Sequence, residues 1–319
     1  MNAPEPSPAD LVAFSRERIE KGSKSFAVAA KLFAPETRAS AFMLYAWCRH
    51  CDDVIDGQTL GFNEAATDNP TGETALEVVK DLEEKTQAAC AGHADEPVFQ
   101  ALSSVCAKHQ IPSKYPLDLI AGFQMDAQAR TYQTIDDTLE YCYHVAGVVG
   151  VMMAMVMGAK DRAVLDRACD LGLAFQLTNI ARDIVADHEV NRVYLPDDWL
   201  AAAGLNRANM ADVSNRPDLS NVANRLLDTA EPYYRSATLG LPHLPLRSAW
   251  AVAVALNVYR AIGLKVRERG AAAWDQRAGT SQLSKFVGVA SGLGTSLASR
   301  TKQSNDSMAP RTGLWTMPD

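Results

Sequence analysis

The segment Tyr45-Ala46-Trp47-Cys48-Arg49-His50-Cys51-Asp52-Asp53-Val54-Ile55-Asp56 decides the fold, because it places polar side chains on an otherwise apolar helix. At 3.6 residues per turn, Tyr45, Arg49, Asp52 and Asp56 recur at i, i+4, i+7 and i+11 and share one face. Carboxylates on a buried face need neutralising cations, and Arg49 alone is too little for three acids within five residues. Taken alone, such a pattern most often marks a solvated acidic face.

A second copy of this pattern lies far along the chain, in residues 172–187. Gln176, Asn179, Asp183 and Asp187 fall at i, i+3, i+7 and i+11, separated mostly by Leu, Ile, Ala and Val. Such a stripe suits neither solvent nor a core, but it suits the wall of a polar cavity. Two Asp-x-x-x-Asp pairs facing each other would offer the oxygens that Mg²⁺ prefers while it bridges to substrate phosphates. The two stripes together predict a Mg²⁺–diphosphate site.

The size and composition of the chain are those of an ordinary globular protein. Its 319 residues suffice for a sizeable core, and 47% of them are hydrophobic and 22% charged. A net charge of −7, without any Lys/Arg cluster, argues against a nucleic-acid partner. An acidic protein that handles an anionic substrate needs metal ions as intermediaries, which agrees with the acidic stripes.

Neither the N-terminus nor the apolar runs predict export or membrane insertion. The first six residues lack the basic and hydrophobic regions of a signal peptide. The longest apolar run, Val145–Met157, has thirteen residues, whereas a spanning helix needs roughly 20. We therefore expect a cytoplasmic protein. Cys48-Arg49-His50-Cys51 is formally a C-x-x-C pair, but no second pair follows at zinc spacing, which favours reduced, buried thiols.

Helical periodicity dominates and alternating strand patterns are absent, which predicts an all-α fold. Besides the two stripe helices, we expect helices over about 73–91, 97–109, 117–130, 136–157, 219–238 and 247–269. Gly147 and Gly150 in mid-helix cost about 1 kcal/mol each relative to Ala. Small residues there allow close approach of either another helix or a ligand. No interdomain linker is evident. We expect an N-terminal segment and first helix over 1–21, one catalytic domain over 22–300 and a disordered tail over 301–319.

The predicted arrangement suits ionisation of a prenyl diphosphate. Metal-bound diphosphate is a good leaving group, and Arg49 and Arg182 would stabilise the charge that develops as the C–O bond breaks. The resulting carbocation must be shielded from water, which explains an apolar interior below a polar metal end. Neutral groups such as Tyr141, Gln176 and Asn179 can steer the cation or relay a proton without trapping it. These residues predict a Mg²⁺-dependent prenyl-diphosphate enzyme.

Three long segments resemble the signatures of the squalene/phytoene synthase family: CRHCDDVID at 48–56, YCYHVAGVVG at 141–150 and QLTNIARD at 176–183. The likeness extends from Gly22-Ser23-Lys24-Ser25-Phe26 to Ala273-Trp274-Asp275 and so covers nearly all of the chain except its termini. It implies an isoprenoid-synthase-type helical bundle around a central cavity. It also implies head-to-head condensation of two geranylgeranyl diphosphates, through prephytoene diphosphate, to phytoene and two diphosphates. That reaction is the first committed step of carotenoid biosynthesis.

The resemblance also assigns roles to residues. It implies that Mg²⁺, with Mn²⁺ as the alternative metal, binds to Asp52, Asp56, Asp183 and Asp187 with Asn179 nearby. The positions that match diphosphate contacts are Ser23, Ser25, Tyr45, Arg49, Arg182, Arg192 and Tyr194. Tyr141 and Gln176 match the lining of the rearrangement site, which Tyr259 is expected to join. Phe26 lies on the apolar side of its helix, where the isoprenoid chain is expected.

Other functions of this architecture stay open from the sequence alone. The nearest rival is a squalene-type or dehydrosqualene-type synthase that uses C15 farnesyl diphosphate; small Ala30, one turn from Phe26, favours the deeper C20 chain. No Gly-rich dinucleotide fingerprint follows a strand, so we expect no nicotinamide cofactor. A non-catalytic scaffold relative would be expected to lose stripe carboxylates, and a terpene cyclase is disfavoured by the symmetrical pairs. Because substrate and product are lipids, peripheral contact with the membrane and with other carotenoid-pathway enzymes is expected.

Overall fold

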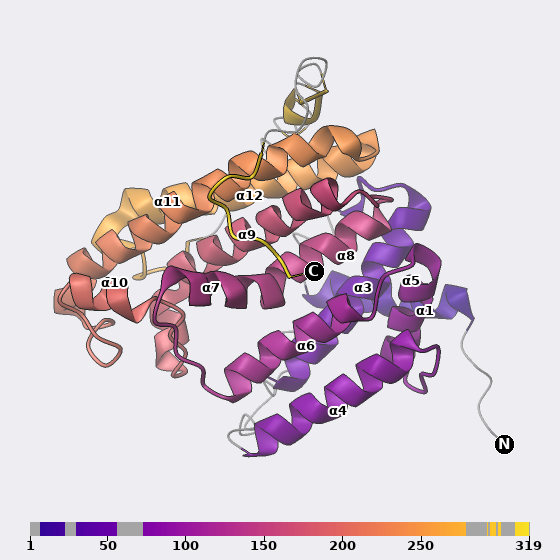
Figure 1. Ribbon diagram of the computed structural model, residues 1–319, viewed down its shortest axis with the longest axis horizontal. Coiled ribbons are helices and arrows are strands. Elements are labelled where there is room, and N and C mark those ends of the chain that lie inside the picture. The colour runs from indigo at the N-terminus through magenta and orange to yellow at the C-terminus, as the bar shows by residue number, and fades with distance from the viewer. Residues whose placement is uncertain are drawn as a thin grey trace. The chain divides into compact units, whose positions relative to one another are not determined.

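Helices form all of the regular structure in the residues that the computed structural model describes, which are 7–22, 30–55, 73–278, 292, 294–297, 299–300 and 310–318 (Figure 1). The all-α prediction is therefore confirmed. The predictions for Ser23, Ser25, Phe26 and Asp56 lie outside the described residues. By internal contacts the chain divides into two compact units, Met1–Gln128 with Met152–Lys160, and Ala129–Val151 with Asp161–Asp319. The extent of the catalytic domain, 22–300, stays a prediction.

The first unit is built around α3. Its helices are α1 (Pro8–Gly22), α3 (Pro35–Ile55), α4 (Glu73–Cys90), α5 (Pro97–His109) and α6 (Lys114–Ala127). α3 contacts each of the other four, because its apolar face is wide enough to do so. Trp47 and Leu44 of α3 are buried within this unit. A hydrogen bond of 2.8 Å between His109 Nε2 and Ser40 Oγ joins α5 to α3.

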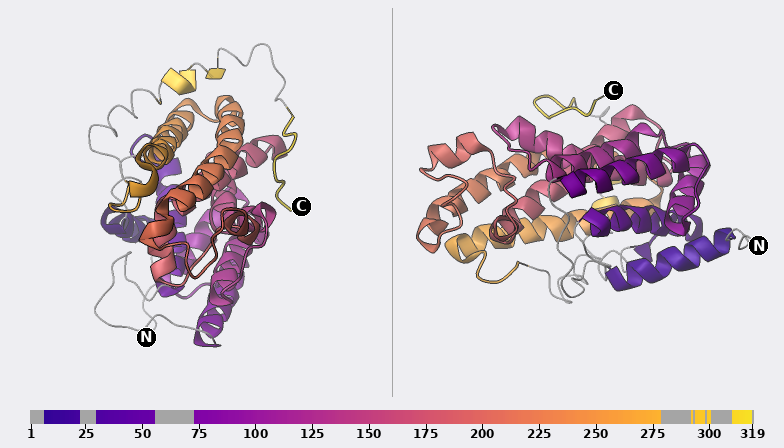
Figure 2. Two further views of the ribbon diagram at one scale, coloured as in Figure 1. Left: turned by 90° about the vertical axis from the view of Figure 1, so that its left-hand side faces the viewer. Right: turned by 90° about the horizontal axis from the view of Figure 1, so that it is seen from below.

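The second unit is built around α9 (Arg162–Glu189). α9 begins at Asp161, whose carboxylate accepts a hydrogen bond from the Ala163 amide, as a helix N-cap does. It packs against α11 (Arg216–Gly240) most extensively, and against α12 (Leu246–Arg269) and α7 (Ile135–Cys142). α11 and α12 run alongside each other in the views of Figures 1 and 2. Shorter elements complete the unit: η1 (Tyr143–Gly147), α10 (Asp197–Ala202), η2 (Val213–Asn215), η3 (Leu241–His243) and η4 (Gly270–Ala272).

A glycine contact brings α9 close to the helix that precedes it. That helix comprises α7, the π-helical turn η1 and α8 (Val148–Val156). A Cβ atom on Gly150 would lie 2.4 Å from the carbonyl oxygen of Ala168, and one on Gly172 would lie 2.3 Å from that of Ala146. Of the two explanations that the sequence left open for Gly147 and Gly150, the structure therefore shows close approach of another helix. The π-helical turn itself was not predicted.

Two helical stretches among the described residues are long and apolar enough to cross a bilayer by length and hydropathy alone. They are Ile135–Val156 and Leu246–Ala272. Both exceed the thirteen-residue run that the sequence singled out. Core helices of globular proteins pass the same criterion, and 56% and 44% of the two windows are buried inside the protein. These two helices are therefore weak evidence for membrane insertion.

Residues 310–318, part of the tail 301–319 that was predicted to be disordered, make defined contacts with α9 and α11. Arg311 forms an ion pair with the buried Asp170 of α9, and Met317 is itself buried. The composition of the tail is polar, which suggested disorder, but its arginine meets a carboxylate 141 residues away in sequence.

Candidate active site

The first acidic stripe lies on α3, with Arg49 at its centre. Arg49 Nη1 lies 2.9 Å from Asp52 Oδ2, and Arg49 Nε donates a hydrogen bond of 2.9 Å to Asp53 Oδ1. Asp53 is buried, whereas the side chain of Asp52 is 41% exposed. One guanidinium therefore neutralises two carboxylates, and the sequence did not assign Asp53 this part. Tyr45 is half-buried on the same helix.

The two thiols of the C-x-x-C pair of α3 lie in surroundings that disfavour the thiolate. Cys51 is fully buried, and burial raises the pKa of Cys48 to about 12. A thiol with such a pKa stays protonated at neutral pH and is a poor nucleophile or metal ligand. Cys51 is buried as expected, whereas Cys48 is half-buried, and the reduced state of the pair stays a prediction.

The second acidic stripe lies on α9, on the side away from its apolar face. The side chains of Gln176 and Asn179 are neighbours on this stripe: Asn179 Nδ2 donates a long hydrogen bond of 3.4 Å to Gln176 Oε1. The Asn179 Oδ1 atom is buried and accepts no hydrogen bond from the described residues. A buried amide oxygen in that state is an available ligand for a cation, since buried polar atoms are otherwise nearly always paired.

Asp183 carries two guanidinium groups on its carboxylate. Arg182 Nε and Nη2 donate to its two oxygens at 2.9 and 2.5 Å, and Arg277 Nε and Nη2 donate at 3.0 and 2.9 Å. Burial of Asp183 opposes ionisation, but these hydrogen bonds and positive charges hold its pKa below the usual value. Asp183 is therefore ionised, as a metal ligand must be, and the two guanidinium groups beside it suit a diphosphate.

Arg277 contacts the second acidic stripe, and sequence reasoning missed it. It lies eight residues beyond the end of α12, 94 residues from Asp183 in sequence. The preceding Trp274 donates its indole hydrogen to the Ala181 carbonyl at 3.2 Å, and the Arg216 guanidinium lies 5.5 Å above its ring. Trp274 therefore docks this segment on α9 and directs Arg277 to the acidic stripe. No periodicity connects Arg277 to Asp183; only the family-like Ala273-Trp274-Asp275 motif hinted at the segment.

Three tyrosines form an aromatic cluster in the second unit. The rings of Tyr141 and Tyr194 stack at 4.5 Å with an interplanar angle of 16°, and Tyr132 packs on both at 5.5 and 6.0 Å. Thr138 Oγ1 donates to the Tyr194 carbonyl at 2.9 Å, which fixes the chain that follows α9. The structure thus brings together Tyr141 and Tyr194, which were predicted site residues, and adds Tyr132, which was not predicted.

The remaining predicted residues of this unit flank α9. Tyr259 of α12 stacks on Phe175, the residue before Gln176 on α9, at 4.1 Å and 19°. The Arg192 amide donates to the Asp187 carbonyl at 2.8 Å as the chain leaves α9, so Arg192 follows closely on Asp187.

The structure thus shows the two halves of the predicted site separately, one on α3 and one on α9. The two acidic stripes belong to different units, and their facing each other across one cavity stays a prediction. Within the described ranges, no three His, Cys, Asp or Glu side chains gather at one point. Asp56 lies outside those ranges.

Comparison with known proteins gives consistent matches over nearly the whole chain. The family model described as squalene/phytoene synthase matches residues 19–286. The chain is 56% identical over 301 residues to a 15-cis-phytoene synthase of Enterobacter agglomerans, which covers 94% of this chain and 100% of that protein. It is 53% identical to a 15-cis-phytoene synthase of Pantoea ananas, with coverages of 97% and 98%.

Solved structures show the same fold. A dehydrosqualene synthase in complex with ligand matches with a TM-score of 0.80 and 25% identity, covering 91% of this chain and 98% of that one. A squalene synthase of Alicyclobacillus acidocaldarius matches with a TM-score of 0.72 and 23% identity, with coverages of 82% and 95%. The isoprenoid-synthase-type fold expected from the sequence is thereby confirmed.

Proposed function

The chain belongs to the squalene/phytoene synthase family, and on this premise we propose that it condenses two geranylgeranyl diphosphates head to head to phytoene. It is accordingly a prenyltransferase. One observation carries the choice of substrate and product: 56% identity to a 15-cis-phytoene synthase over all of that relative. We propose the same 15-cis product for this chain, as the first committed step of carotenoid biosynthesis.

The proposed reaction has two ionisations. The C–O bond of the first substrate breaks, and diphosphate leaves with the electron pair. The double bond of the second substrate attacks the allylic cation, and loss of a proton closes the cyclopropane of prephytoene diphosphate. Its own C–O bond then breaks, the cation rearranges, and loss of a second proton gives phytoene and a second diphosphate.

The donor set on each stripe fits Mg²⁺. We propose Asp183, Asp187 and Asn179 as ligands on α9, and Asp52 and Asp56 on the other stripe. The support is chemical. The ionised Asp183 and the buried Asn179 Oδ1, which has no hydrogen-bond partner among the described residues, are the hard oxygen ligands that this ion prefers. Protein sites often supply only part of its shell beside phosphate oxygens. When bound, Mg²⁺ would neutralise charge on the leaving diphosphate.

Arginines on each stripe are suited to bind a diphosphate. Arg49 and Arg182 already contact the stripe carboxylates, and guanidinium groups bind diphosphate oxygens in pairs of hydrogen bonds. Arg277 is 72% exposed, so it can turn from Asp183 to an incoming diphosphate without disrupting the core. In our proposal these groups stabilise negative charge that grows as each C–O bond ionises.

The aromatic and amide groups guide the cation. Tyr141 and Tyr194 present a stacked pair of π-faces, which attract positive charge. Gln176 and Tyr259 would line the same path as neutral groups, because a neutral amide or phenol hydrogen-bonds without capturing the cation. Buried, largely apolar surroundings exclude water, which would otherwise quench it to an alcohol.

We further propose that the protein works in the cytoplasm and meets membranes peripherally to exchange its lipid substrate and product. Exposed Leu246 and Leu264 on α12 give apolar contact points for such an encounter. We also propose contact with other carotenoid-pathway enzymes.

Product analysis from a mixed incubation tests the proposed function. Equal amounts of labelled geranylgeranyl and farnesyl diphosphate are supplied with Mg²⁺ and without nicotinamide. We expect phytoene as the main product. A C30 product would instead support a dehydrosqualene-type synthase, and no condensation product would refute the proposal. Ala30 is buried, and the Ala30→Phe variant should shift preference toward the C15 substrate if this position sets chain depth.

A further inference from the structure

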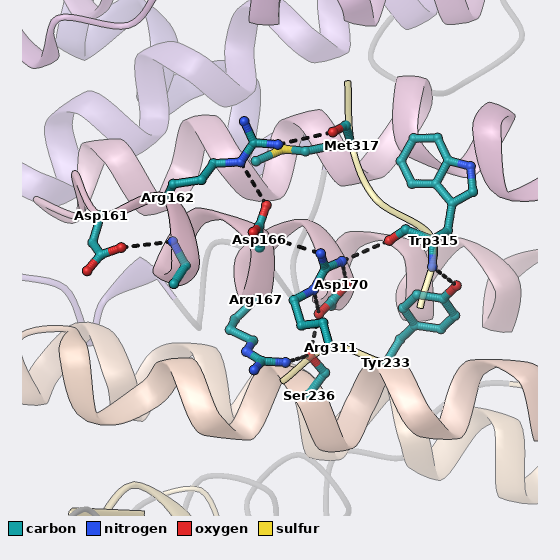
Figure 3. Close-up of polar contacts among 11 residues, drawn as sticks. Asp161, Arg162, Asp166, Arg167, Asp170, Tyr233, Ser236, Arg311, Trp315 and Met317 are labelled. Carbon is teal, nitrogen blue, oxygen red and sulfur yellow. Dashed lines mark hydrogen bonds and ion pairs between the residues drawn. The ribbon is translucent and has the colours of Figure 1, made fainter. Parts of the chain in front are cut away.

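A buried carboxylate of α9 is not used by the proposed reaction. Asp170 is fully buried, and the Ser236 hydroxyl of α11 donates a short hydrogen bond to it. At about 100° per residue, Asp170 lies about 140° around α9 from Asp183 and about 180° from Asn179. It therefore faces away from the stripe, toward α11 and the C-terminal residues (Figure 3).

The cation that meets Asp170 comes from the C-terminal segment. Arg311 Nε donates to Asp170 Oδ2 at 3.0 Å and Arg311 Nη2 donates to Oδ1 at 2.6 Å, a bidentate pair. Arg167 is also close, but its Nη1 donates to Ser236 at 2.6 Å instead (Figure 3). A fully buried carboxylate needs counter-charge. Arg311 supplies the bidentate ion pair, and the buried Arg167, joined to Asp170 through Ser236, adds a second positive charge.

Independent contacts hold the rest of residues 310–318 on the same face. The Trp315 amide donates to the Tyr233 hydroxyl at 3.1 Å, and its ring lies 5.3 Å from that of Tyr143 in the π-helical turn. Arg162 Nη2 donates to the Met317 carbonyl at 3.0 Å. The segment therefore touches α9, α11 and η1 at once, as Figure 3 shows for its labelled contacts.

The described residues place polar connections between α9 and α11 at two points. At the first, Ser236 of α11 bonds Asp170 and Arg167 of α9 directly, and Arg311 and Trp315 add the C-terminal segment to this point. The second is the buried hydrogen bond of 2.8 Å between Thr178 Oγ1 and the Tyr234 hydroxyl. It lies about two turns farther along α9, beside the stripe. Two directional connections on one face fix both the rotation of a helix about its axis and its register, which apolar packing alone fixes less sharply.

We propose that residues 310–318 are a clasp that sets the rotation and register of α9, and that Arg311 is a positioning residue for the acidic stripe, acting through Asp170. The clasp itself is argued from contacts alone; only its catalytic consequence rests on the proposed function. Without Arg311, the buried charge of Asp170 favours a turn of α9 toward solvent, and the stripe on its opposite face turns with it.

Hydrogen exchange on the full-length protein tests this. The variants are Arg311→Ala, the charge-retaining Arg311→Lys, and Arg267→Ala as matched control, since Arg267 makes an exposed ion pair of 2.7 Å with Asp228 between α12 and α11. We expect amides at 176–187 to exchange at least about tenfold faster in Arg311→Ala, beyond any change in α12, because local opening is set by local contacts. Arg311→Lys should show the same pattern more weakly, and Arg267→Ala should match the wild type.

Two outcomes would overturn the proposal. One is faster exchange confined to 161–173 and 310–318; the other is a uniform increase across α9 and α12, which would mean that the clasp adds only general stability. If Arg311→Ala does not fold, the Arg311→Lys pattern decides between the same outcomes.

Turnover of geranylgeranyl diphosphate then measures the catalytic consequence. Below the unfolding transition, kcat of Arg311→Ala should fall by on the order of tenfold or more, as misplacement of catalytic groups does, while the KM changes little and Arg267→Ala keeps the wild-type rate. An unchanged kcat would overturn the positioning role. If the wild type itself makes no product, the proposed function fails while the exchange pattern still decides the clasp.

Discussion

Replacing Gly172 with alanine would push a methyl group into the backbone of the neighbouring π-helical turn. The new Cβ would lie 2.3 Å from the Ala146 oxygen, 2.6 Å from the Ala146 carbonyl carbon and 2.6 Å from Gly147 Cα. Close backbone C···O contacts are normally about 3.3 Å or longer. Because all three obstructing atoms belong to the main chain, no side chain can rotate away, and α9 must move by roughly 1 Å.

The magnitude follows from two opposing effects. Overpacking of a well-packed core costs about 1–3 kcal/mol, and a clash with backbone belongs at the upper end. Alanine gains about 1 kcal/mol over glycine within a helix, which leaves a net loss of about 2 kcal/mol. Gly172 is one turn before Gln176 on α9, so the same displacement moves the acidic stripe. A 1 Å misplacement of catalytic groups can lower the rate about 10²-fold.

Urea unfolding followed by circular dichroism measures the free energy, and product formation measures the rate. Gly263→Ala is the matched control, because its Cβ would meet the flexible tip of the Leu227 side chain at 2.9 Å rather than backbone. We expect Gly263→Ala to be nearly neutral in both assays. If Gly172→Ala were as stable and as active as the wild type, the close helix contact would not be the constraint that the structure indicates.

Other predictions test individual elements. Tyr194→Ala should lower the free energy of unfolding by about 3–5 kcal/mol, because it removes a buried ring stacked on Tyr141; a loss below 1 kcal/mol would contradict this. Asp137→Ala should cost about 1 kcal/mol in thermal unfolding, since its carboxylate caps α7 by accepting the Thr134 amide at 2.8 Å. Burial lowers the pKa of His50 below 6.5, so the unfolded chain binds the proton more readily and the free energy of unfolding falls as pH drops below 6.5. In His50→Gln this decline should be smaller; an identical pH profile would refute the assignment.

Local sequence signals predicted the parts of the fold that local physics determines. The helix Pro97–His109 was placed at its observed bounds, because proline starts it and its apolar spacing continues to the end. The same spacing placed each stripe on one helix. The structure adds that Arg49 pairs with Asp52 and Arg182 with Asp183, whereas the sequence had assigned both arginines to the diphosphate. Each of these pairs lies within one turn of a single helix.

Contacts between distant parts of the chain were beyond such reasoning. Arg277 reaches Asp183 across 94 residues and Arg311 reaches Asp170 across 141, and no period links residues at those separations. Disorder was predicted for the tail because its residues are mostly polar. Polar composition indicates exposure to solvent, but it does not show that one residue pairs with a buried partner far away in sequence. Asp170 resembled a routine helix acid, since its burial depends on how α9 packs against α11.

Diphosphate release from geranylgeranyl diphosphate, compared between the wild type, Asp52→Asn and Asp183→Asn, tests most directly that the two acidic stripes perform the reaction. Asparagine keeps the size of each side chain but removes the negative charge that would bind the metal and, through the metal, the diphosphate. At one fixed Mg²⁺ concentration, we predict that each variant keeps its helical circular dichroism and loses more than about 99% of release, in line with removal of a group that stabilises transition-state charge. A wild-type rate of release in either folded variant would contradict the account.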